Sequence, residues 1–274
     1  PFFALCVLMS ACPPCRAESL PLRIVSLAPS LTRQVHDLHE DARIVGVTSY
    51  CPRYAQRAAV IGNLTAVNFE KICSLKPDLV LAGTDCNKKN DIEKLRSLGL
   101  KVEVFSGCES FACMCSTFVR LGKLLGREKE AAEITADVRV KIESLSSRIQ
   151  GRKAPKVFWQ VGANPLVTAS DQTFTGELIR LAGGRNIFGN LKVTYPRINM
   201  ESVVTGNPEV IIMVGDMMEG MRDPRSQWAS FRQISAVKTG RMHVMSADLV
   251  CQPTPVMFFK ACEAVAAKLY PGAL

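Results

Sequence analysis

The residues EKEAAEITADVRVKIESLSSRIQ, at Glu128–Gln150, are the strongest indication of how this chain is organised. They contain neither Gly nor Pro and are rich in Ala, Glu, Lys and Arg, so they predict one uninterrupted helix. At about 1.5 Å per residue, such a helix is roughly 35 Å long. Gly126 marks a break before it, and Gly151 ends it. A rod of this length can cross from one lobe of a protein to another, whereas a flexible linker would be rich in Gly and Ser.

Short apolar strands alternate with helical segments on both sides of this rod. On its N-terminal side, the pattern predicts strands at Arg23–Leu27, Arg43–Val47, Asp78–Ala82 and Lys101–Phe105. On its C-terminal side, it predicts strands at Lys156–Val161, Val210–Val214 and Arg241–Met245. The accompanying helices are expected at Ser30–Leu38, Asn68–Leu75, Lys88–Leu98, Phe111–Leu125, Thr173–Leu181, Met200–Thr205 and Thr254–Leu269. Such alternation with short loops is typical of a parallel sheet flanked by helices.

We therefore expect an α/β protein with two Rossmann-like lobes, each built on a parallel-rich sheet, joined by a single long spine helix. The predicted divisions are 22–125 for the N-terminal α/β lobe, 126–153 for the spine helix and 154–274 for the C-terminal α/β lobe. Residues 1–21 are set apart as a signal-peptide remnant and N-terminal linker. In such an arrangement the cleft between the lobes is the natural ligand site.

The composition fits a globular protein and excludes several classes of function. Of the 274 residues, 47% are hydrophobic and 22% are charged, and the net charge is +9. The Lys and Arg residues are dispersed among Asp and Glu, without zinc-finger spacing or an aromatic RNA-binding motif, so no nucleic-acid partner is expected. Imidazoles come only from His36, His39 and His243, which disfavours a free transition metal as cargo and predicts no metal site.

Motifs of common enzymes are also missing. The sequence contains no GxSxG, GxxxxGK[ST] or HExxH motif. With three histidines, general-base chemistry would depend on carboxylates, and the sequence marks out no pair of them. We expect no enzyme and no catalytic residues; an exported enzyme that uses carboxylates is the alternative of a different class.

The first residues predict an export signal. The run PFFALCVLMSA, at Pro1–Ala11, is apolar but too short to span a bilayer, and small residues and prolines follow it. We interpret it as the back half of a signal peptide. Met9–Cys12 is similar to a lipobox, which would leave Cys12 lipidated, and a cut before Glu18 is the equal alternative.

The chain has 11 cysteines, and an exported protein can form disulfides. Four of them lie just past predicted strands, on the side where the cleft should form: Cys51, Cys86, Cys108 and Cys251. A disulfide such as Cys86–Cys108 is our first interpretation. Buried thiols are the second, and ligation of a metal by thiolates is the third.

Seven further segments, taken together and in their order along the chain, carry a resemblance to a known family. They are RIVSLAPSLT (Arg23–Thr32), IVGVTSYC (Ile44–Cys51), IGNLTAVNFEKICSLKPDLVLAG (Ile61–Gly83), QVGANPLVTAS (Gln160–Ser170), ELIRLAGGRNIF (Glu177–Phe188), YPRINMESVVTGNPEVIIM (Tyr195–Met213) and AVKTGRMHVMSAD (Ala236–Asp248). In this order the chain resembles the periplasmic substrate-binding proteins of ABC importers for cobalamin, haem and iron-siderophores. The resemblance covers nearly all of the chain after Leu22 and is strongest to the cobalamin-binding members.

The resemblance implies a transport role and its partners. A member of this family captures a small-molecule ligand between rigid lobes and delivers it to ABC permease transmembrane subunits with their cytoplasmic ATPase. The expected ligand is a corrinoid similar to vitamin B12, with haem or a ferric siderophore as the alternative, and no cofactor is expected. The protein would be a monomer in the periplasm, or lipid-anchored on the outer face of the cytoplasmic membrane. It would meet the membrane only through the permease or that anchor.

The resemblance also implies ligand-binding residues. Tyr50 and Tyr195 match positions of ligand-contacting aromatic residues, and Trp159 is a candidate wall residue, although core packing explains it more simply. The matching contact loop comprises Asp248, Leu249, Val250, Cys251 and Gln252, where Gln252 replaces an arginine. The other candidates are Pro29, in the first loop, and Leu64 and Gly83, which stand where cobalamin binders have tryptophans.

Two glutamates match permease-docking positions of the family. Glu70 and Glu201 each follow an Asn-x pair, so the pattern Asn-x-Glu opens one predicted helix in each lobe. Both lie in the first turn of a predicted helix, where the helix dipole alone also favours an acid. A second-lobe disulfide of the cobalamin binders is incomplete, because Cys262 is present but Ala182 stands at the partner position. These departures bear on the ligand more than on the fold or the transport role.

Overall fold

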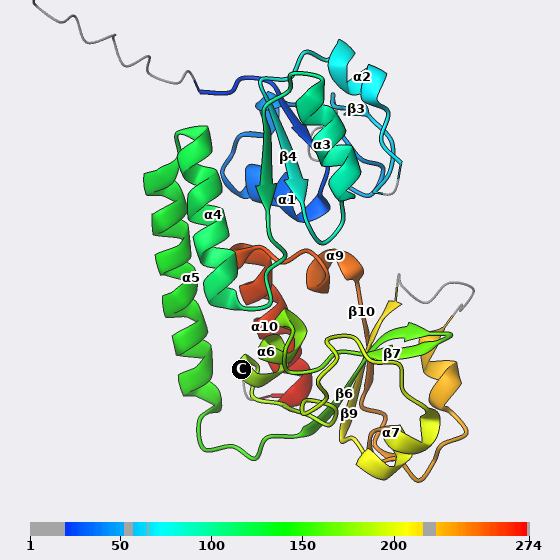
Figure 1. Ribbon diagram of the computed structural model, residues 1–274. Helices are drawn as coiled ribbons and strands as arrows, with labels where there is room; N and C mark the ends of the chain where they lie inside the picture. Colours follow the sequence, from blue (N-terminus) through cyan, green and yellow to red (C-terminus); the bar gives the residue numbers. More distant parts are fainter. Residues whose placement is uncertain (1–19, 52–56, 65, 216–222, 273–274) are drawn as a thin grey trace, which may run out of the picture.

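The computed structural model describes residues 20–51, 57–64, 66–215 and 223–272. They form two α/β lobes, one above the other in Figure 1, with two long helices along one side. Cys12 and residues 1–19 of the predicted signal remnant lie outside the described residues. The expected fold class, two α/β lobes with parallel-rich sheets, is confirmed.

The N-terminal lobe contains an all-parallel sheet of order β3-β2-β1-β4-β5. Its central strand β1 (Ile24–Ser26) is buried throughout, and Ile24 and Val25 pack into two different hydrophobic cores. Helices must therefore cover both faces of the sheet, as parallel sheets require. The other elements are β2 (Ile44–Val47), β3 (Ala59–Val60), β4 (Leu79–Gly83), β5 (Val102–Phe105), α1 (Pro29–Asp37), the 3-10 turn η1 (Asp41–Arg43), α2 (Phe69–Ser74) and α3 (Lys89–Ser97).

The C-terminal lobe repeats this plan with one antiparallel strand. Its sheet has the order β10-β9-β6-β7, with β8 beside β6, and only β7 runs antiparallel among the described strands. Phe158 and Trp159 of the long strand β6 (Lys156–Ala163) pack into opposite cores. The other elements are β7 (Leu166–Thr168), β8 (Arg185–Asn186), β9 (Val210–Val214), β10 (Met242–Met245), α6 (Phe174–Leu181), α7 (Met200–Gly206), η3 (Pro224–Trp228), α8 (Ser235–Lys238), α9 (Ala247–Val250) and α10 (Pro255–Leu269).

The predicted spine is helix α5 (Glu128–Ile149), 22 residues long, and it runs along both lobes in Figure 1. Its buried residues recur every three or four positions, so one face of the helix meets the protein. Ala131 belongs to the N-terminal core, whereas Val138, Ile142 and Leu145 belong to the C-terminal core. One straight helix thus contributes to the interior of both lobes.

Helix α4 (Phe111–Leu125) lies beside α5 and also reaches both lobes. Phe111 and Met114 pack into the C-terminal core, and Phe118 and Leu121 into the N-terminal core. The carboxylate of Glu177, on α6, accepts a hydrogen bond of 2.6 Å from the backbone N–H of Phe111, which fixes the start of α4 to the C-terminal lobe. The spine is therefore a pair of helices, and the divisions at 125 and 153 remain a proposal.

A helix that crosses a bilayer needs about 20 consecutive, mostly apolar residues. None of those within the described ranges is both long and apolar enough to cross a membrane.

Candidate ligand-binding site

The carboxyl ends of the strands position the site, because loops at these ends carry ligand contacts in parallel sheets. Strand β4 points towards the C-terminal lobe in Figure 1, so the loop after it faces that lobe. Helix α9, which follows β10, lies between the two lobes in the same view. The segments after β4 and β10 therefore approach each other from opposite sides.

One cavity, which we call the apolar pocket, has a volume of about 310 Å³. Strands β6 and β9 form its floor, the first turn of α6 and the end of α9 form its sides, and Tyr195 comes from the loop before α7. Its lining residues are Trp159, Val161, Phe174, Thr175, Tyr195, Val214, Val250 and Cys251. The structure thus brings together four of the candidate residues, Trp159, Tyr195, Val250 and Cys251. Their contact with a ligand stays a prediction.

Two aromatic residues of this pocket have different environments. Trp159 is 1% exposed and belongs to the C-terminal core, so it offers at most one edge to the cavity. Tyr195 is 43% exposed and stands at the mouth. Burial raises the pKa of Tyr195, and the nearby Cys251, Glu109 and Asp85 raise it too, against a hydrogen bond with Thr175 that lowers it. Since Asp85 follows β4, the mouth is shared by both lobes.

The junction pocket, as we call a second cavity of about 20 Å³, lies where the lobes meet. Its walls come from α1, from the loops after β4 and β5, and from Pro253 of the C-terminal lobe. Gly83 and Cys108 among the candidate residues line it, together with Ser30, Gln34, Asp85 and Ser106. Asp85 therefore belongs to this pocket and also acts on Tyr195 at the mouth of the apolar pocket.

The contact loop expected at Asp248–Gln252 is built around α9. Ser246 caps this helix by accepting a hydrogen bond from the backbone N–H of Asp248. The side chain of Asp248 is exposed, and its Oδ1 accepts a hydrogen bond of 2.8 Å from Nε2 of Gln252. Leu249 is half-buried and Val250 is buried. Asp248 and Gln252 therefore fix each other's orientation on the loop.

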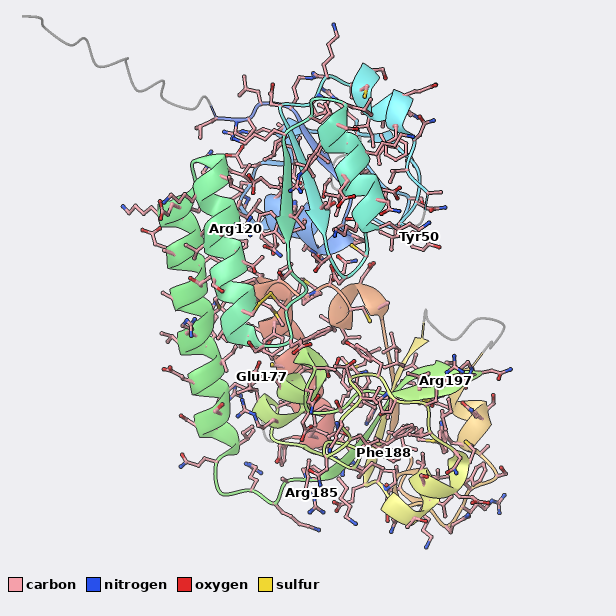
Figure 2. All side chains as sticks on the ribbon, in the orientation of Figure 1. Tyr50, Arg120, Glu177, Arg185, Phe188 and Arg197 are labelled. Carbon is pink, nitrogen blue, oxygen red and sulfur yellow. A yellow bond between two sulfur atoms is a disulfide. The ribbon has the colours of Figure 1, made fainter. Side chains whose placement is uncertain are left out.

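Outside the contact loop, whose Asp248, Leu249 and Gln252 line neither pocket, three further candidate residues also line neither of them. Pro29 is the first residue of α1 and is half-buried, next to Ser30, which does line the junction pocket. Tyr50 is 67% exposed, and Figure 2 shows it at the edge of the N-terminal lobe that is turned towards the other lobe. Leu64 is half-buried between β3 and α2. Of the three, Tyr50 is placed best to meet a ligand that fills the space between the lobes.

The two candidate docking glutamates occupy equivalent places. Glu70 and Glu201 are exposed, in the first turns of α2 and α7. In each helix the Asn side chain two residues earlier accepts a backbone hydrogen bond, at 2.9 Å for Asn68 and 2.8 Å for Asn199. Helices α2 and α7 lie at the far ends of the two lobes, on the side away from α4 and α5 (Figure 1). The caps explain why both helices begin where they do.

The cysteine pairing expected from the sequence was wrong. Cys108 forms its disulfide with Cys113, five residues later in the first turn of α4. Cys86 is a free thiol, and burial is the main cause that raises its pKa to about 12. Both Cys108 and Cys86 lie beside the junction pocket, since Cys86 Sγ sits near Gly83. Among the described residues, no group of three or more His, Cys, Asp or Glu could hold a metal ion.

Sequence reasoning missed several residues of the two pockets. Phe174 and Thr175 stand in the first turn of a predicted helix, and Val214 ends a predicted strand. Because these positions lie at the carboxyl end of the predicted sheet, they could have been recognised as pocket residues. Nothing in the sequence marks Gln34 as a pocket residue, because the helical pattern around it does not reveal which lobe-to-lobe contact the helix makes.

These features define the class of protein. The sequence profile of the periplasmic binding protein family matches residues 24–249, so the chain belongs to this family of solute-binding proteins. It is 27% identical over 241 residues to the vitamin B12-binding protein of Photorhabdus laumondii subsp. laumondii, with 85% of this chain and 87% of the relative covered. The expected family resemblance is thereby confirmed.

Solved structures give the same result for the fold. The periplasmic vitamin B12 binding protein BtuF of Vibrio cholerae has a TM-score of 0.75 and 26% identity, with 91% of this chain and 97% of that chain covered. The periplasmic haem binding protein HutB of Vibrio cholerae has a TM-score of 0.82 at 17% identity, with 91% and 99% covered. At that identity, the likeness to HutB shows the fold alone.

Proposed function

We propose that this protein is the ligand-capturing component of an ABC importer and that it carries a corrinoid between its lobes. The observation that carries the proposal is the apolar pocket of about 310 Å³, with the ring of Tyr195 at its mouth and an edge of Trp159 in its wall. Aromatic walls bury the flat faces of a macrocycle well, and the pocket would take one part of a ligand whose remainder lies at the mouth. The vitamin B12-binding relatives support the same cargo.

The charges near the mouth favour a corrinoid over haem. Asp85 and Glu109 lie close enough to Tyr195 to raise its pKa, and Asp248 is exposed on the contact loop. These acids repel carboxylates such as haem propionates, since like charges at an interface are unfavourable. The carboxamide groups at the rim of a corrinoid are neutral and meet no such repulsion.

Haem is the second candidate because of two side chains in the apolar pocket. Tyr195 and Cys251 both line it, and tyrosine and cysteine are residue types that ligate haem iron. A ferric siderophore stays a further alternative within the same importer class. In each case the transport role is the same and only the ligand differs.

A titration of the purified protein with cyanocobalamin, dicyanocobinamide and haemin tests the cargo. We expect one-to-one binding of both corrinoids by calorimetry, with haemin weaker by about tenfold or more. Tight binding of haemin with a shifted absorbance spectrum, and none of the corrinoids, would overturn the corrinoid assignment in favour of haem. The protein without ligand and an unrelated protein of similar charge serve as controls for nonspecific haemin adsorption.

The proposal includes a partner and a location. Glu70 and Glu201 would dock on arginines of the permease, one from each lobe, where charge pairing supplies register and specificity. The protein would act as a monomer in the periplasm, either free or held by a lipid on Cys12. The match to the periplasmic binding protein family supports this location.

A further inference from the structure

The junction pocket contains a buried acceptor without a donor. Gln34 is 3% exposed, lines this pocket, and its Oε1 forms no hydrogen bond with any described residue. A buried carbonyl oxygen in this state is costly, and native proteins leave few of them. The structure therefore indicates that a donor from outside the chain reaches Gln34.

A second acceptor of the same kind comes from the other lobe. Gln252 is 9% exposed, and its Oε1 also has no partner among the described residues. Its Nε2 donates to Asp248 at 2.8 Å, and this bond settles which end of the amide is the oxygen. Gln252 directly precedes Pro253, which lines the junction pocket.

One hydrogen bond joins the segments that carry these two glutamines. The hydroxyl of Thr254 donates to Oδ2 of Asp37 at 2.7 Å, between the start of α10 and the end of α1. Asp37 lies one helical turn after Gln34, and Thr254 lies two residues after Gln252. The two segments that carry the unsatisfied oxygens therefore meet at one lobe-to-lobe junction.

The lining of the junction pocket selects the kind of group that can enter. None of the described residues that line it is Lys, Arg or His, whereas Asp85 adds a carboxylate to the carbonyl of Gln34. A volume of about 20 Å³ admits a group the size of one water molecule. An –NH2 group fits this size and offers two donors, whereas a carboxylate offers acceptors only.

We infer that the junction pocket is a subsite for a primary carboxamide of the ligand and that Gln34 and Gln252 make the protein prefer carboxamides over carboxylates. The inference rests on the proposed function, because the body of the ligand occupies the neighbouring apolar pocket. Asp85 connects the two, since it lines the junction pocket and acts on Tyr195 at the mouth of the other. Donation of N–H to the oxygens of Gln34 and Gln252 would satisfy the two acceptors that have no partner among the described residues.

The test compares two corrinoids that differ in their rim groups. Dicyanocobinamide carries carboxamides, whereas dicyano-cobyrinic acid carries carboxylates, and calorimetry gives the dissociation constant of each for wild type, Gln34→Leu, Gln252→Met and Gln34→Glu. We expect the two apolar variants to bind dicyanocobinamide about tenfold more weakly and to lose most of the preference over the acid. Gln34→Glu keeps an acceptor oxygen and should keep the preference. Gln233→Leu, at an exposed glutamine of the C-terminal lobe, is the matched control.

The outcomes separate this inference from the proposed function. If wild type binds neither corrinoid, the cargo assignment fails; if it binds them and the apolar variants keep the wild-type ratio, the subsite alone fails. The ligand-free melting temperature gives a readout that needs no corrinoid. We expect Gln34→Leu to melt at or above the wild-type temperature, since it removes an unsatisfied acceptor. A clear fall in the melting temperature would show that Gln34 is satisfied within the protein and would overturn the subsite.

Discussion

Tyr195 is the residue through which the two lobes share one site. It belongs to the C-terminal lobe, yet Asp85 and Glu109 of the other half of the chain act on its phenol. Burial is the main cause of its raised pKa, so the phenol keeps its proton at neutral pH. A neutral phenol can donate a hydrogen bond to a ligand while its ring offers an aromatic face.

Substitutions of Tyr195 separate these two contributions. Tyr195→Ala should weaken corrinoid binding by about tenfold, because the aromatic face and its apolar area are lost. Tyr195→Phe keeps the ring and should stay within about threefold of wild type. Calorimetric dissociation constants at pH 7 measure both. Equal losses for Ala and Phe would assign the effect to the hydroxyl and not to the ring.

The raised pKa of Cys86 predicts that the protein loses stability at alkaline pH. Burial and the nearby Asp85 raise its pKa to about 12 in the folded protein, against an ordinary value of 9.0. Between these values the unfolded chain releases the thiol proton and the folded chain keeps it, so the free energy of unfolding falls as pH rises. The slope from this group is at most about 1.4 kcal/mol per pH unit.

Urea unfolding of reduced protein at intervals from pH 8 to pH 11 measures this effect. Cys86→Ala should show a shallower decline than wild type, with the difference growing above pH 9. Cys73→Ala, which removes a free thiol from α2, is the matched control. Parallel profiles for wild type and Cys86→Ala would contradict the assignment.

At the level of the helices, the packing of α4 against α5 depends on one close approach, at Gly122. Gly126, with φ 74°, ends α4 in a left-handed cap and lets the chain turn into α5. One turn earlier, a Cβ on Gly122 would lie 2.6 Å from Cβ of Ala131 and 2.9 Å from the carbonyl oxygen of Arg127. The missing side chain of Gly122 is therefore what allows the two helices to pack here.

Gly122→Ala should destabilise the protein although alanine is the better helix former. We expect a loss of about 1–3 kcal/mol in the free energy of unfolding, because the helices must separate or shift. Adding Ala131→Gly removes the opposing Cβ and should recover part of the loss, minus about 1 kcal/mol for glycine within a helix. Urea unfolding of the two single variants and the double variant measures the coupling. Purely additive losses would rule out this contact as the cause.

The long helices and the central strands were predictable from the sequence, whereas the short elements β3, β7, β8, α8 and α9 and the pairings between elements were not. Glu128–Gln150 lacks helix breakers, and α5 indeed spans Glu128–Ile149. The role of α4 as a second spine helix depends on tertiary packing, which a period of hydrophobic residues does not encode. The partner of Cys108 depended on the path of the loop before α4, where Cys113 lies nearer than Cys86. Gln34 was invisible for the same reason, since its significance comes from a lobe-to-lobe junction.

At the scale of the whole molecule, several links hold the lobes together. Helices α4 and α5 contribute to both cores, and Glu177 fixes the start of α4 to the C-terminal lobe. The hydrogen bond from Thr254 to Asp37 adds a link close to the ligand site. Two packed helices resist bending more than a single strand or loop would, so we expect little closure on ligand binding. A rigid molecule keeps Glu70 and Glu201 at a constant spacing, whether or not ligand is bound.

Constant spacing makes the docking proposal testable by charge reversal. Glu70→Arg combined with Glu201→Arg should reduce uptake of labelled corrinoid through the permease by about a hundredfold or more, because buried like charges at an interface repel. Both side chains are exposed and remote from the pockets, so the dissociation constant for ligand should not change. The matched control is Glu133→Arg with Glu143→Arg, two exposed glutamates of α5 that undergo the same change of charge. Equal uptake by the two double variants would refute the docking role, whereas a loss confined to the first, with ligand affinity intact, would place the permease contact at the tips of both lobes.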